Sequence, residues 1–467
     1  MASKWVEVPL EQLKAQTKSA FAMGPFGSKI KAENFTTVGV PVIKGGNLNA
    51  TYLDESDFDF LTQEKADELE SAKARRLDIV ITHRGTLGQV GLIPEDSKYE
   101  EYVVSQSQLK MSFDIKRVDP YFVYYFLKSP LGQSRLLSNV SQVGVPAIAQ
   151  ALTSVRAIEI PIPEDRSEQT HISSVLRSLD DKIDLNRRIN QTLAAMTQAI
   201  FKSWFVDFDP VKAKIAAIEQ GQDPLRAAMR AISGKTDAEL DQMPREHHDQ
   251  FAATAALFPD AMEESELGEI PKGWKAGTLA EICHLNPESW SAKTLPNTVS
   301  YVDLANTKSG EISELQVVSE KDIPSRARRI LRSGDTIIGT VRPGNRSFAL
   351  VGKENLTGST GFAVLRPIAQ EWLEFVYLVA TSRSNIDRLT HLADGGAYPA
   401  VRPEVVVQGN IVIPDRMLAQ GFHQYVQPFW VNILANREST ETLAELRDVL
   451  LPELLSGNIY IQHEEDR

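Results

Sequence analysis

Two glycine-rich stretches are the first places where this sequence could support chemistry on a phosphate. Residues 85–91 read GTLGQVG, and residues 339–347 read GTVRPGNRS. The first stretch spaces its glycines as GxxGxxG rather than as the GxGxxG of a dinucleotide-binding turn, and it lies between two strand-like runs. The second has Asn345-Arg346 where a phosphate-binding loop needs Gly-Lys. Both stretches are therefore predicted to be hairpin loops.

Other catalytic signatures fail as well. Asp-x-Lys triplets occur at 96–98 and 180–182, but such triplets are common by chance and the second lies in a predicted long helix. The sequence contains no Asn/Asp-Pro-Pro-aromatic tetrapeptide of an amino-methyltransferase and no Cys/His cluster with zinc spacing. His247 and His248 lie in an acidic stretch and are expected to be solvated. The sequence predicts a recogniser and not a catalyst.

Length and composition limit where such a recogniser works. A chain of 467 residues is expected to form two or three domains. No run of about eighteen apolar residues could span a bilayer, and the N-terminal MASKWVEVPL lacks the apolar core of a signal peptide. The single cysteine, Cys283, cannot form an internal disulfide. Together these features predict a cytoplasmic protein with no membrane partner.

The distribution of charge keeps a nucleic-acid partner open. The net charge of −12 argues at first against one. However, residues 207–269 alone carry 14 acidic and 6 basic residues, which accounts for most of the excess. Residues 274–416 carry 16 basic and 15 acidic residues, so this part is near neutral and can carry a local basic face.

The sequence contains an internal repeat. LDIVITHRGTLG around Asp78 and GDTIIGTVRPG around Asp335 both read as a strand entering a hairpin. Residues 119–137 and 371–389 both read as an aromatic-rich helix followed by a shorter helix. Each copy then ends in Ile-Pro and is followed by a long helical pattern. Each copy therefore predicts a β-rich domain followed by a long helix.

The two long helices match at a constant offset of 250 residues. Their apolar positions recur at threes and fours, as in the seam of a coiled coil, although either helix alone could be an ordinary amphipathic helix. An asparagine stands at the same seam position in both copies, where it costs stability and fixes register. The helices are therefore expected to pack antiparallel on each other around a pseudo-twofold axis. The predicted seam residues are Ile172, Leu179, Ile183, Asn186, Leu193, Met196 and Ile200, and Phe422, Phe429, Ile433, Asn436, Leu443, Leu446 and Leu450.

The predicted fold class is α+β, with two β-rich domains joined by two long antiparallel coiled-coil helices in an internal pseudo-twofold repeat. The stretch at 257–274, which reads LFPDAMEESELGEIPKGW, is expected to be a surface linker running into the second domain. The expected divisions of the chain are 1–164, 165–206, 207–269, 270–416 and 417–467, in the order first β-rich domain, central helix, acidic helical linker, second β-rich domain, and C-terminal helix with its tail.

Two motifs and this layout resemble the specificity (S) subunit of type I restriction–modification systems. The motifs are NRRINQTLAAMTQAIFKSWFVDFDPVKAK at 186–214 and ELGEIPKGW at 266–274. The resemblance covers essentially the whole chain. It implies that the β-rich domains are target recognition domains, each reading one half of a bipartite site on double-stranded DNA, and that the helices are conserved spacers.

The resemblance also implies partners and cofactors. Two methylation subunits would bind S-adenosylmethionine and methylate adenine N6, and two restriction subunits would cleave DNA with ATP and Mg²⁺. The specificity subunit itself would carry no catalytic residue, no metal and no cofactor, which agrees with the lack of a recognisable catalytic motif in the sequence.

Residue type and loop placement select candidate DNA-reading residues. Arginine suits the O6/N7 edge of guanine, and asparagine or glutamine suits the N6/N7 edge of adenine. About half of real contacts go to phosphates, and any one of these side chains could instead be simply solvated. In the first domain the candidates are Ser28, Lys29, Lys31, Lys44, Asn47, His83, Arg84, Thr86, Gln106, Gln108 and Gln142. In the second domain they are Arg326, Arg328, Arg329, Arg342, Asn345, Arg346, Ser359, Thr360, Tyr398 and Arg402.

Two interpretations stay open on the sequence alone. Trp204, Phe205 and Phe208 at the end of the first long helix are expected to be core, with a methylation-subunit interface as the alternative. The chain as a whole is expected to bind DNA, with a structural adaptor that assembles protein subunits as the alternative. An enzyme that fuses recognition to catalysis would need a further domain, and no part of the chain is left over for one.

Overall fold

The structure is a computed structural model that describes residues 4–141, 144–313, 315–394, 396 and 399–459. The chain divides into two compact units. The first unit consists of Met1–Arg188 and Arg437–Arg467, and the second of Ile189–Asn436. No helix among the described residues is both long enough and apolar enough to span a membrane.

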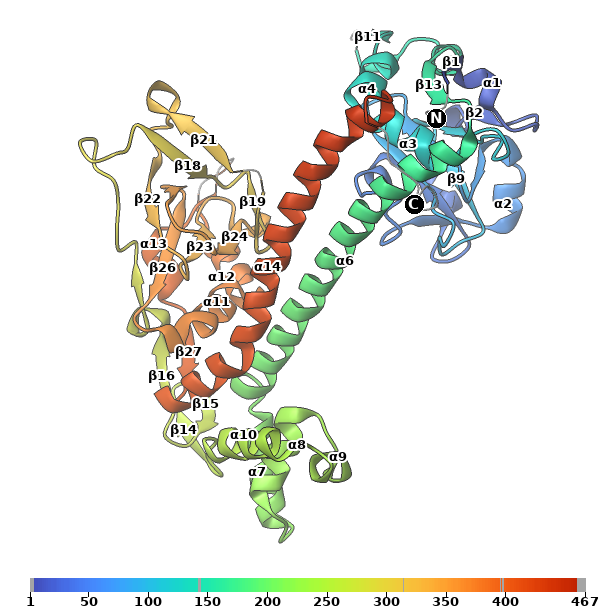
Figure 1. Ribbon diagram of the computed structural model, residues 1–467. Coiled ribbons are helices and arrows are strands. Elements are labelled where there is room, and N and C mark those ends of the chain that lie inside the picture. Colours follow the sequence, from blue (N-terminus) through green and yellow to red (C-terminus); the bar gives the residue numbers. More distant parts are fainter. Residues whose placement is uncertain (1–3, 142–143, 314, 395, 397–398, 460–467) are drawn as a thin grey trace, which may run out of the picture. The chain divides into compact units, whose positions relative to one another are not determined.

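Two helices of 40 residues, α6 (Arg166–Phe205) and α14 (Arg416–Leu455), contribute one half to each unit (Figure 1). In the first unit, Asn186 Nδ2 donates to Ser439 Oγ at 3.3 Å. In the second unit, Asn436 Nδ2 donates to Asn190 Oδ1 at 2.9 Å, and Asn190 Nδ2 donates to the Ile433 carbonyl at 3.2 Å. As the residue number rises along α6 from Asn186 to Asn190, the number of its partner in α14 falls from Ser439 to Ile433. This confirms the predicted antiparallel arrangement. Both repeated asparagines lie between the helices.

Most of the predicted seam residues lie inward, but two do not. Ile172, Ile183, Asn186, Phe422 and Ile433 are buried. Half-buried positions follow them along both helices at Leu179, Leu193, Ile200, Phe429, Asn436, Leu443 and Leu450.

Met196 and Leu446, which occupy corresponding positions at the offset of 250, are each 45% exposed, so their placement in the seam is wrong. A straight α-helix has 3.6 residues per turn, so a strict heptad drifts around it. Buried Thr197 and half-buried Arg447, one residue further on, lie inward instead.

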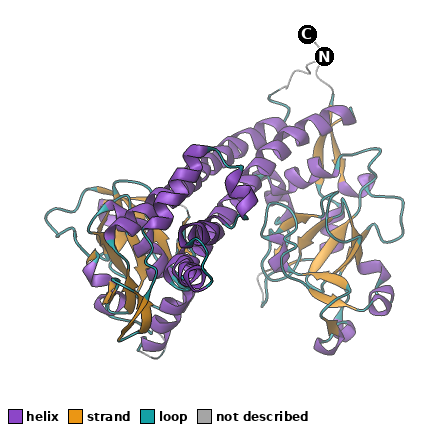
Figure 2. Cartoon of the chain, turned by 90° about the horizontal axis from the view of Figure 1, so that it is seen from below, coloured by secondary structure: helices purple, strands orange, loops and turns teal. Residues whose placement is uncertain are grey.

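The first unit is built on two main sheets, with the helices beside them (Figure 2). Strand β7 reads Ile-Val-Ile-Thr and is buried at all four positions, as expected for β-branched residues at the centre of a covered sheet. One sheet has the order β2 (Phe21–Met23), β10 (Gln108–Met111), β7 (Ile79–Thr82), β8 (Val90–Leu92). The other has the order β3 (Phe35–Thr36), β5 (Asp59–Leu61), β4 (Val40–Ile43), β9 (Glu101–Val104), β6 (Lys73–Arg75). Two pairs complete the unit: β1 (Trp5–Pro9) with β13 (Glu159–Pro163), and β11 (Val140–Ser141) with β12 (Ala147–Ile148).

The helices of the first unit follow the aromatic-rich pattern. Helix α3 (Pro120–Lys128) starts at Asp119, whose side chain accepts from the Tyr121 amide at 2.9 Å. It ends at Ser129, which caps the next helix by accepting from the Gly132 amide at 3.1 Å. The remaining helices of the unit are α1 (Leu10–Leu13), α2 (Gln63–Asp67), α4 (Pro130–Leu136) and α5 (Ala151–Arg156).

The second unit repeats the strand order of the first, except that among the described residues its second sheet lacks a counterpart of the edge strand β3. Both units contain a parallel strand pair, β4 with β9 in the first and β18 with β25 in the second. One four-stranded sheet has the order β17 (Cys283–Leu285), β26 (Phe362–Pro367), β23 (Thr336–Gly339), β24 (Phe348–Leu350). The other has the order β21 (Gln316–Ser319), β18 (Thr298–Val302), β25 (Leu356–Ser359), β22 (Ala327–Leu331). The shorter pairs are β16 (Lys275–Thr278) with β27 (Asn410–Ile413), and β19 (Thr307–Lys308) with β20 (Glu311–Ile312).

The predicted hairpins are confirmed, since β7 pairs with β8 and β23 with β24. One helix length was predicted wrongly: α12 (Arg383–Leu392) has 10 residues and is not shorter than α11 (Leu373–Thr381) with 9. The other helices of the second unit are α7 (Asp209–Glu219), α8 (Pro224–Ser233), α9 (Asp237–Asp241), α10 (Arg245–Ala256) and α13 (Pro403–Val407).

The stretch at 257–274 is not the surface linker that its composition suggested. It forms the hairpin β14 (Met262–Ser265) and β15 (Gly268–Pro271), and Phe258, Ile270 and Trp274 are buried. The acidic residues between these anchors made the segment look solvated.

Aromatic side chains dominate the core of the second unit. Trp204 and Phe205 are buried there, as predicted, and Trp204 stacks on Tyr425 with ring centroids 5.6 Å apart. Phe208 is half-buried and packs on Trp274 at 5.6 Å. Cys283 is buried in the same core, where its Sγ donates to the Leu279 carbonyl at 3.1 Å and burial raises the pKa of the thiol to about 12.

Candidate nucleic-acid interface

Three loops of the first unit meet at one end of its sheets. His83 at the end of β7 places its Nε2 3.1 Å from the Gln106 carbonyl in the β9–β10 turn. Its backbone amide donates to the Ser107 carbonyl at 2.9 Å, and the Gly85 amide donates to the Pro146 carbonyl at 2.8 Å. The β7–β8 hairpin, the β9–β10 turn and the loop before β12 are thereby held together.

His83 acts within this cluster as a positioning residue. It is buried, and burial lowers the pKa of its imidazole, so the ring is neutral at physiological pH. A buried neutral ring committed to a backbone carbonyl does not fit the base-reading role predicted for it.

Asn47 was also predicted to read DNA, and its geometry assigns it to the fold instead. Its side chain is 8% exposed. The oxygen accepts from the Lys44 amide at 2.9 Å, and the nitrogen donates to the carbonyls of Asp54 at 3.1 Å and Asp57 at 2.8 Å. Both hydrogens of the amide nitrogen are donated within the loop and the oxygen accepts one bond, so Asn47 fixes the loop after β4 and has no donor left for a base edge.

A buried polar network supports the same loops from below. Gln108, 1% exposed, donates to Thr82 Oγ1 at 3.2 Å, and Thr82 Oγ1 donates to Gln89 Oε1 at 2.8 Å. Gln89 then reaches the Gly45 carbonyl at 3.0 Å. A side chain at Gly45 would collide with this network, since a Cβ there would lie 2.9 Å from Gln89 Oε1. Gln108 is therefore a support and not a reader, and Gln89 is a supporting residue that the sequence reading missed.

The remaining candidates of the first unit are on the surface. Lys44 is exposed, lies 5.0 Å from the centroid of the Phe35 ring and pairs with Asp59. Lys31 pairs with Glu33 at 3.4 Å. The exposed candidates are Lys29, Lys31, Lys44, Arg84, Thr86 and Gln106. The side chain of Ser28 and the whole of Gln142 lie outside the described residues.

The β23–β24 hairpin of the second unit presents two arginines in an uncommon backbone conformation. Arg342 has φ 48° and Arg346 has φ 59°, and they flank the short turn at Pro343–Asn345. L-residues other than glycine, asparagine and aspartate rarely adopt this left-handed region. Arg342, Asn345 and Arg346 are all exposed, and the Arg346 guanidinium lies 5.4 Å from the centroid of the Phe348 ring. Non-glycine residues held in this conformation concentrate at functional sites.

A second group of candidates lies just before β22 and at the end of β25. Arg326 is exposed, and its Nε donates to Tyr301 Oη at 3.0 Å while the guanidinium pairs with Asp303. The exposed Thr360 donates its amide to the Arg326 carbonyl at 2.7 Å. Ser359 is buried and accepts from the Gly361 amide at 3.2 Å, so it supports the turn and does not fit a reading role.

The other candidates of the second unit are less informative. Arg328 and Arg329 are half-buried; Arg328 donates to the Ala327 carbonyl at 3.1 Å and Arg329 to Ser289 Oγ at 3.3 Å. Arg402 is exposed. Tyr398 lies outside the described residues.

The same backbone bonds hold the loops of both units. The Thr340 amide donates to the Gly361 carbonyl at 2.8 Å, just as the His83 amide donates to the Ser107 carbonyl in the first unit. Arg342 donates to the Pro399 carbonyl at 2.7 Å, as Gly85 does to that of Pro146.

The loops after β4 and β18 correspond as well. The Asp303 amide donates to Asn306 Oδ1 at 2.8 Å, as the Lys44 amide does to Asn47. Each unit therefore presents one loop frame with different side chains on it. The asparagine that ends both KGGN (44–47) and DLAN (303–306) was a signal in the sequence that this residue is structural.

Comparison with known proteins defines the class to which this fold and these loops belong. Residues 23–195 match the family model of the type I restriction modification DNA specificity domain. The HindI type I restriction enzyme specificity subunit of Haemophilus influenzae is 30% identical over 392 residues, which cover 78% of this chain and 83% of that protein. The chain belongs to the family of type I restriction–modification specificity subunits, which recognise DNA sequence and are not catalysts.

More distant relatives agree. The MjaIX type I restriction enzyme specificity subunit of Methanocaldococcus jannaschii is 22% identical over 359 residues, covering 73% of this chain and 69% of that one. The crystal structure of the S subunit of a type I restriction–modification system from M. genitalium has a TM-score of 0.53 at 14% identity and covers 97% of this chain and 96% of its own. At that identity the structural likeness supports the fold alone.

Proposed function

We propose that this chain directs adenine-N6 methylation to a bipartite site on double-stranded DNA, and cleavage when a restriction subunit is present. Each unit reads one half of the site. The observation that supports this most directly is the pair of loop frames, which share backbone bonds but differ in side chains. Lys44 corresponds to Asp303, and Gln106 corresponds to Thr360. Two frames of one shape with different readers suit two half-sites of different sequence.

In this proposal the target recognition domains are residues 1–164 and 270–416, and the spacers are 165–206 and 417–467. Residues 207–269 form the acidic link between the two copies. Two methylation subunits bring S-adenosylmethionine, and two restriction subunits bring ATP and Mg²⁺. The acidic net charge of −12 is tolerable because partner subunits supply part of the phosphate neutralisation.

The test is methylation mapping in a strain that lacks other methyltransferases. The strain would express the chain with the methylation subunit of its own system, or that subunit alone. A bipartite adenine motif that needs this chain would support the proposal and would reveal both half-sites. Co-purification of the two proteins without any new methylation would overturn it in favour of a structural adaptor.

Half-site assignment has its own test. Replacing Arg342 or Arg346 with alanine is expected to weaken or relax reading of one half-site only, by about 1–3 kcal/mol per base-reading pair. Arg84→Ala in the first unit is the matched control and should affect the other half-site. Equal loss at both half-sites from Arg342→Ala would show that these arginines do not read bases.

A further inference from the structure

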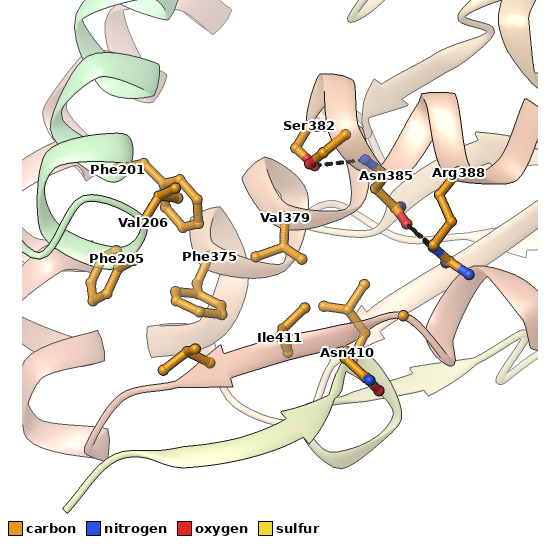
Figure 3. A pocket seen from close by; sticks show the side chains of 14 residues that line it. Phe201, Phe205, Val206, Phe375, Val379, Ser382, Asn385, Arg388, Asn410 and Ile411 are labelled. Carbon is orange, nitrogen blue, oxygen red and sulfur yellow. Dashed lines mark hydrogen bonds between the residues drawn. The ribbon is translucent and has the colours of Figure 1, made fainter. Parts of the chain in front are cut away.

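A pocket of about 280 Å³ opens in the second unit, and none of the proposed DNA-reading residues lines it (Figure 3). Phe201 and Phe205 at the end of α6 and Phe375 and Val379 of α11 form its apolar walls. On another side the pocket is lined by four consecutive residues, Gly409–Val412, which are the first three residues of β27 and the residue before it. Successive side chains of a strand point to opposite faces, so a pocket that touches four in a row lies along the edge of the strand. Among the described residues β27 pairs only with β16, which leaves that edge without a strand partner.

Arg388 of α12 brings a positive charge to this pocket. Its guanidinium donates to Asn385 Oδ1 at 2.8 Å and to the Val405 carbonyl at 3.0 Å. The side chain is half-buried, and burial lowers its pKa without any carboxylate among the described residues that counteracts the shift. A desolvated guanidinium with only neutral acceptors lacks the bidentate carboxylate partner that it binds most strongly.

The first unit supplies that partner at the corresponding place. Arg135 of α4 donates to both oxygens of Glu7, at 2.9 Å and 3.2 Å, and its guanidinium lies 5.8 Å from the centroid of the Phe126 ring. The first unit thus fills this space with its own carboxylate and its own aromatic ring.

The correspondence between the two places rests on backbone geometry. Ser129 caps α4 through the Gly132 amide at 3.1 Å, and Ser382 caps α12 through the Asn385 amide at 3.2 Å. Arg135 lies three residues after Gly132, and Arg388 lies three residues after Asn385, so the two arginines occupy corresponding positions. The same alignment places Val379 where the first unit has Phe126.

The second unit has no counterpart of the Glu7 carboxylate in strand β16. Glu7 pairs with Pro161 in the β1–β13 ladder, and Ala276 pairs with Val412 at the corresponding rung of the β16–β27 ladder. Val412 lines the pocket, so a side chain at Ala276 is on the same face. The second unit therefore keeps the arginine but has alanine for glutamate and valine for phenylalanine.

We propose that this pocket binds the carboxylate of an acidic side chain carried on an apolar segment of a partner subunit, which supplies from outside what Glu7 and Phe126 supply in the first unit. The carboxylate pairs with Arg388, an apolar side chain packs against Phe205 and Phe375, and the backbone of the segment runs along the edge of β27. The identity of the partner as a methylation subunit rests on the proposed function. Because the first unit fills its own site, only one of two methylation subunits makes this contact.

The test uses the full chain and the methylation subunit of its own system, titrated by native mass spectrometry. Ala276→Glu places a carboxylate where Glu7 stands in the first unit, so Arg388 pairs internally. This variant is expected to bind the second methylation subunit at least tenfold more weakly, with a melting temperature equal to or above that of the natural chain. Ala276→Gln has the same size without the charge and should change that affinity less than threefold.

Further variants keep each outcome interpretable. Glu7→Gln breaks the pair in the first unit and should lower its thermal stability while leaving the affinity for methylation subunits unchanged. A photo-crosslinking residue in place of Ser384, an exposed residue of the pocket, should capture the methylation subunit. Capture of DNA or of a restriction subunit, or no capture, would overturn the proposal.

Wild-type affinity of Ala276→Glu, or equal weakening by Glu and Gln, would also overturn it. Methylation mapped in the same preparations separates the two ideas. If a bipartite motif is methylated but Ala276→Glu binds the methylation subunit as tightly as the natural chain does, only the pocket proposal is wrong. If the natural chain produces no methylated motif, the proposed function is wrong.

Discussion

The two units bury different chemistry at corresponding points of the long helices. In the first unit, Asp180 accepts from Tyr125 Oη at 2.8 Å and from Arg447 Nη1 at 2.8 Å. At the offset of 250, Trp430 stands in place of Asp180 and Thr197 in place of Arg447.

The second unit is apolar at this point. Trp430 packs edge-on against Tyr377 with centroids 5.0 Å apart, and Thr197 turns its hydroxyl back to the Leu193 carbonyl at 2.8 Å. One helical pattern thus supports an ion pair in one unit and an aromatic contact in the other.

The two interiors should tolerate different substitutions. A buried ion pair stabilises little beyond a well-packed apolar replacement, but breaking it leaves an uncompensated charge. It also joins α6 to α14 by a bond that only one register satisfies. An aromatic contact gains its free energy from buried area and depends on the volume that it fills. The first unit should therefore be sensitive to loss of one partner, and the second to loss of volume.

Trp430→Ala should have the largest effect on stability. Removing a buried indole leaves a cavity and is expected to lower the free energy of unfolding of the second unit by about 3–5 kcal/mol. Among the described residues Trp430 Nε1 has no hydrogen-bond partner, so Trp430→Phe sacrifices no bond and should cost only about 1–2 kcal/mol. Urea unfolding followed by hydrogen exchange in peptides of each unit measures both. A phenylalanine variant as unstable as the alanine variant would contradict the volume argument.

Asp180→Ala should destabilise the first unit by about 3 kcal/mol. The change removes the acceptor of the Tyr125 hydroxyl and the buried partner of Arg447, which keeps its ion pair with the exposed Asp448 at 2.7 Å. The same exchange measurement should show faster opening in the first unit alone. The double variant Asp180→Leu with Arg447→Met removes both charges and is expected to recover most of the loss. If the double variant is as unstable as the single one, charge burial is not the cause.

Gly85 and Arg342 occupy corresponding positions with φ of 95° and 48°. Gly85→Ala is expected to lower the stability of the first unit by about 1–2 kcal/mol through backbone strain alone, because a Cβ there meets no atom within 4 Å. Arg342→Gly should leave the stability of the second unit unchanged or raise it by about 0.5 kcal/mol, while one half-site is lost. Thermal unfolding and methylation mapping measure the two effects. A destabilised Arg342→Gly would mean that the arginine supports the fold.

The smallest expected effect depends on pH. His423 Nδ1 lies 2.6 Å from Glu374 Oε2, and this hydrogen bond raises the pKa of His423, with a further contribution from the charge of Glu371. A raised folded-state pKa stabilises below the unfolded value of about 6.5, and the contribution is lost as pH rises through the folded value. The second unit should therefore lose about 1–2 kcal/mol between pH 6 and pH 9.

The first unit provides the control for that pH dependence. Ser173 stands in the first unit where the second unit has His423, and its hydroxyl donates to Asp119 at 2.6 Å, so no histidine lies at this position. Urea unfolding at both pH values should show a slope in the second unit only, and His423→Gln should abolish it. A slope that survives in His423→Gln would point to another group.

Much of the fold could be predicted from the sequence because the internal repeat shows in the regular spacing of its apolar residues. The offset of 250, the paired asparagines and the Ile-Pro boundaries led to α6, α14 and two β-rich units. The hairpin at 257–274 was missed because its anchors are single apolar residues among acids. Met196 and Leu446 were misplaced because a heptad count ignores the drift of a straight helix.

The DNA-reading residues were harder to predict, for a physical reason. Asn47, Gln108 and Ser359 have the residue type and loop position of readers, yet their polar atoms are already bonded within the unit. A sequence shows a donor or an acceptor but not whether a distant carbonyl, such as that of Asp57, has taken it. Comparing the two copies would have marked Asn47 as a support, because Asn306 occupies the same place in the second unit. It would not have marked Gln108, because Phe362 stands at that position in the second unit.

The buried thiol of Cys283 makes this chain convenient for labelling. Because this thiol is buried and its pKa is about 12, it should stay unreactive toward maleimides near neutral pH. A cysteine introduced on an exposed residue of each unit would then form the only reactive pair in the molecule. Fluorophores on such a pair would follow the separation of the two units in real time as partners and DNA bind, without first removing any natural residue.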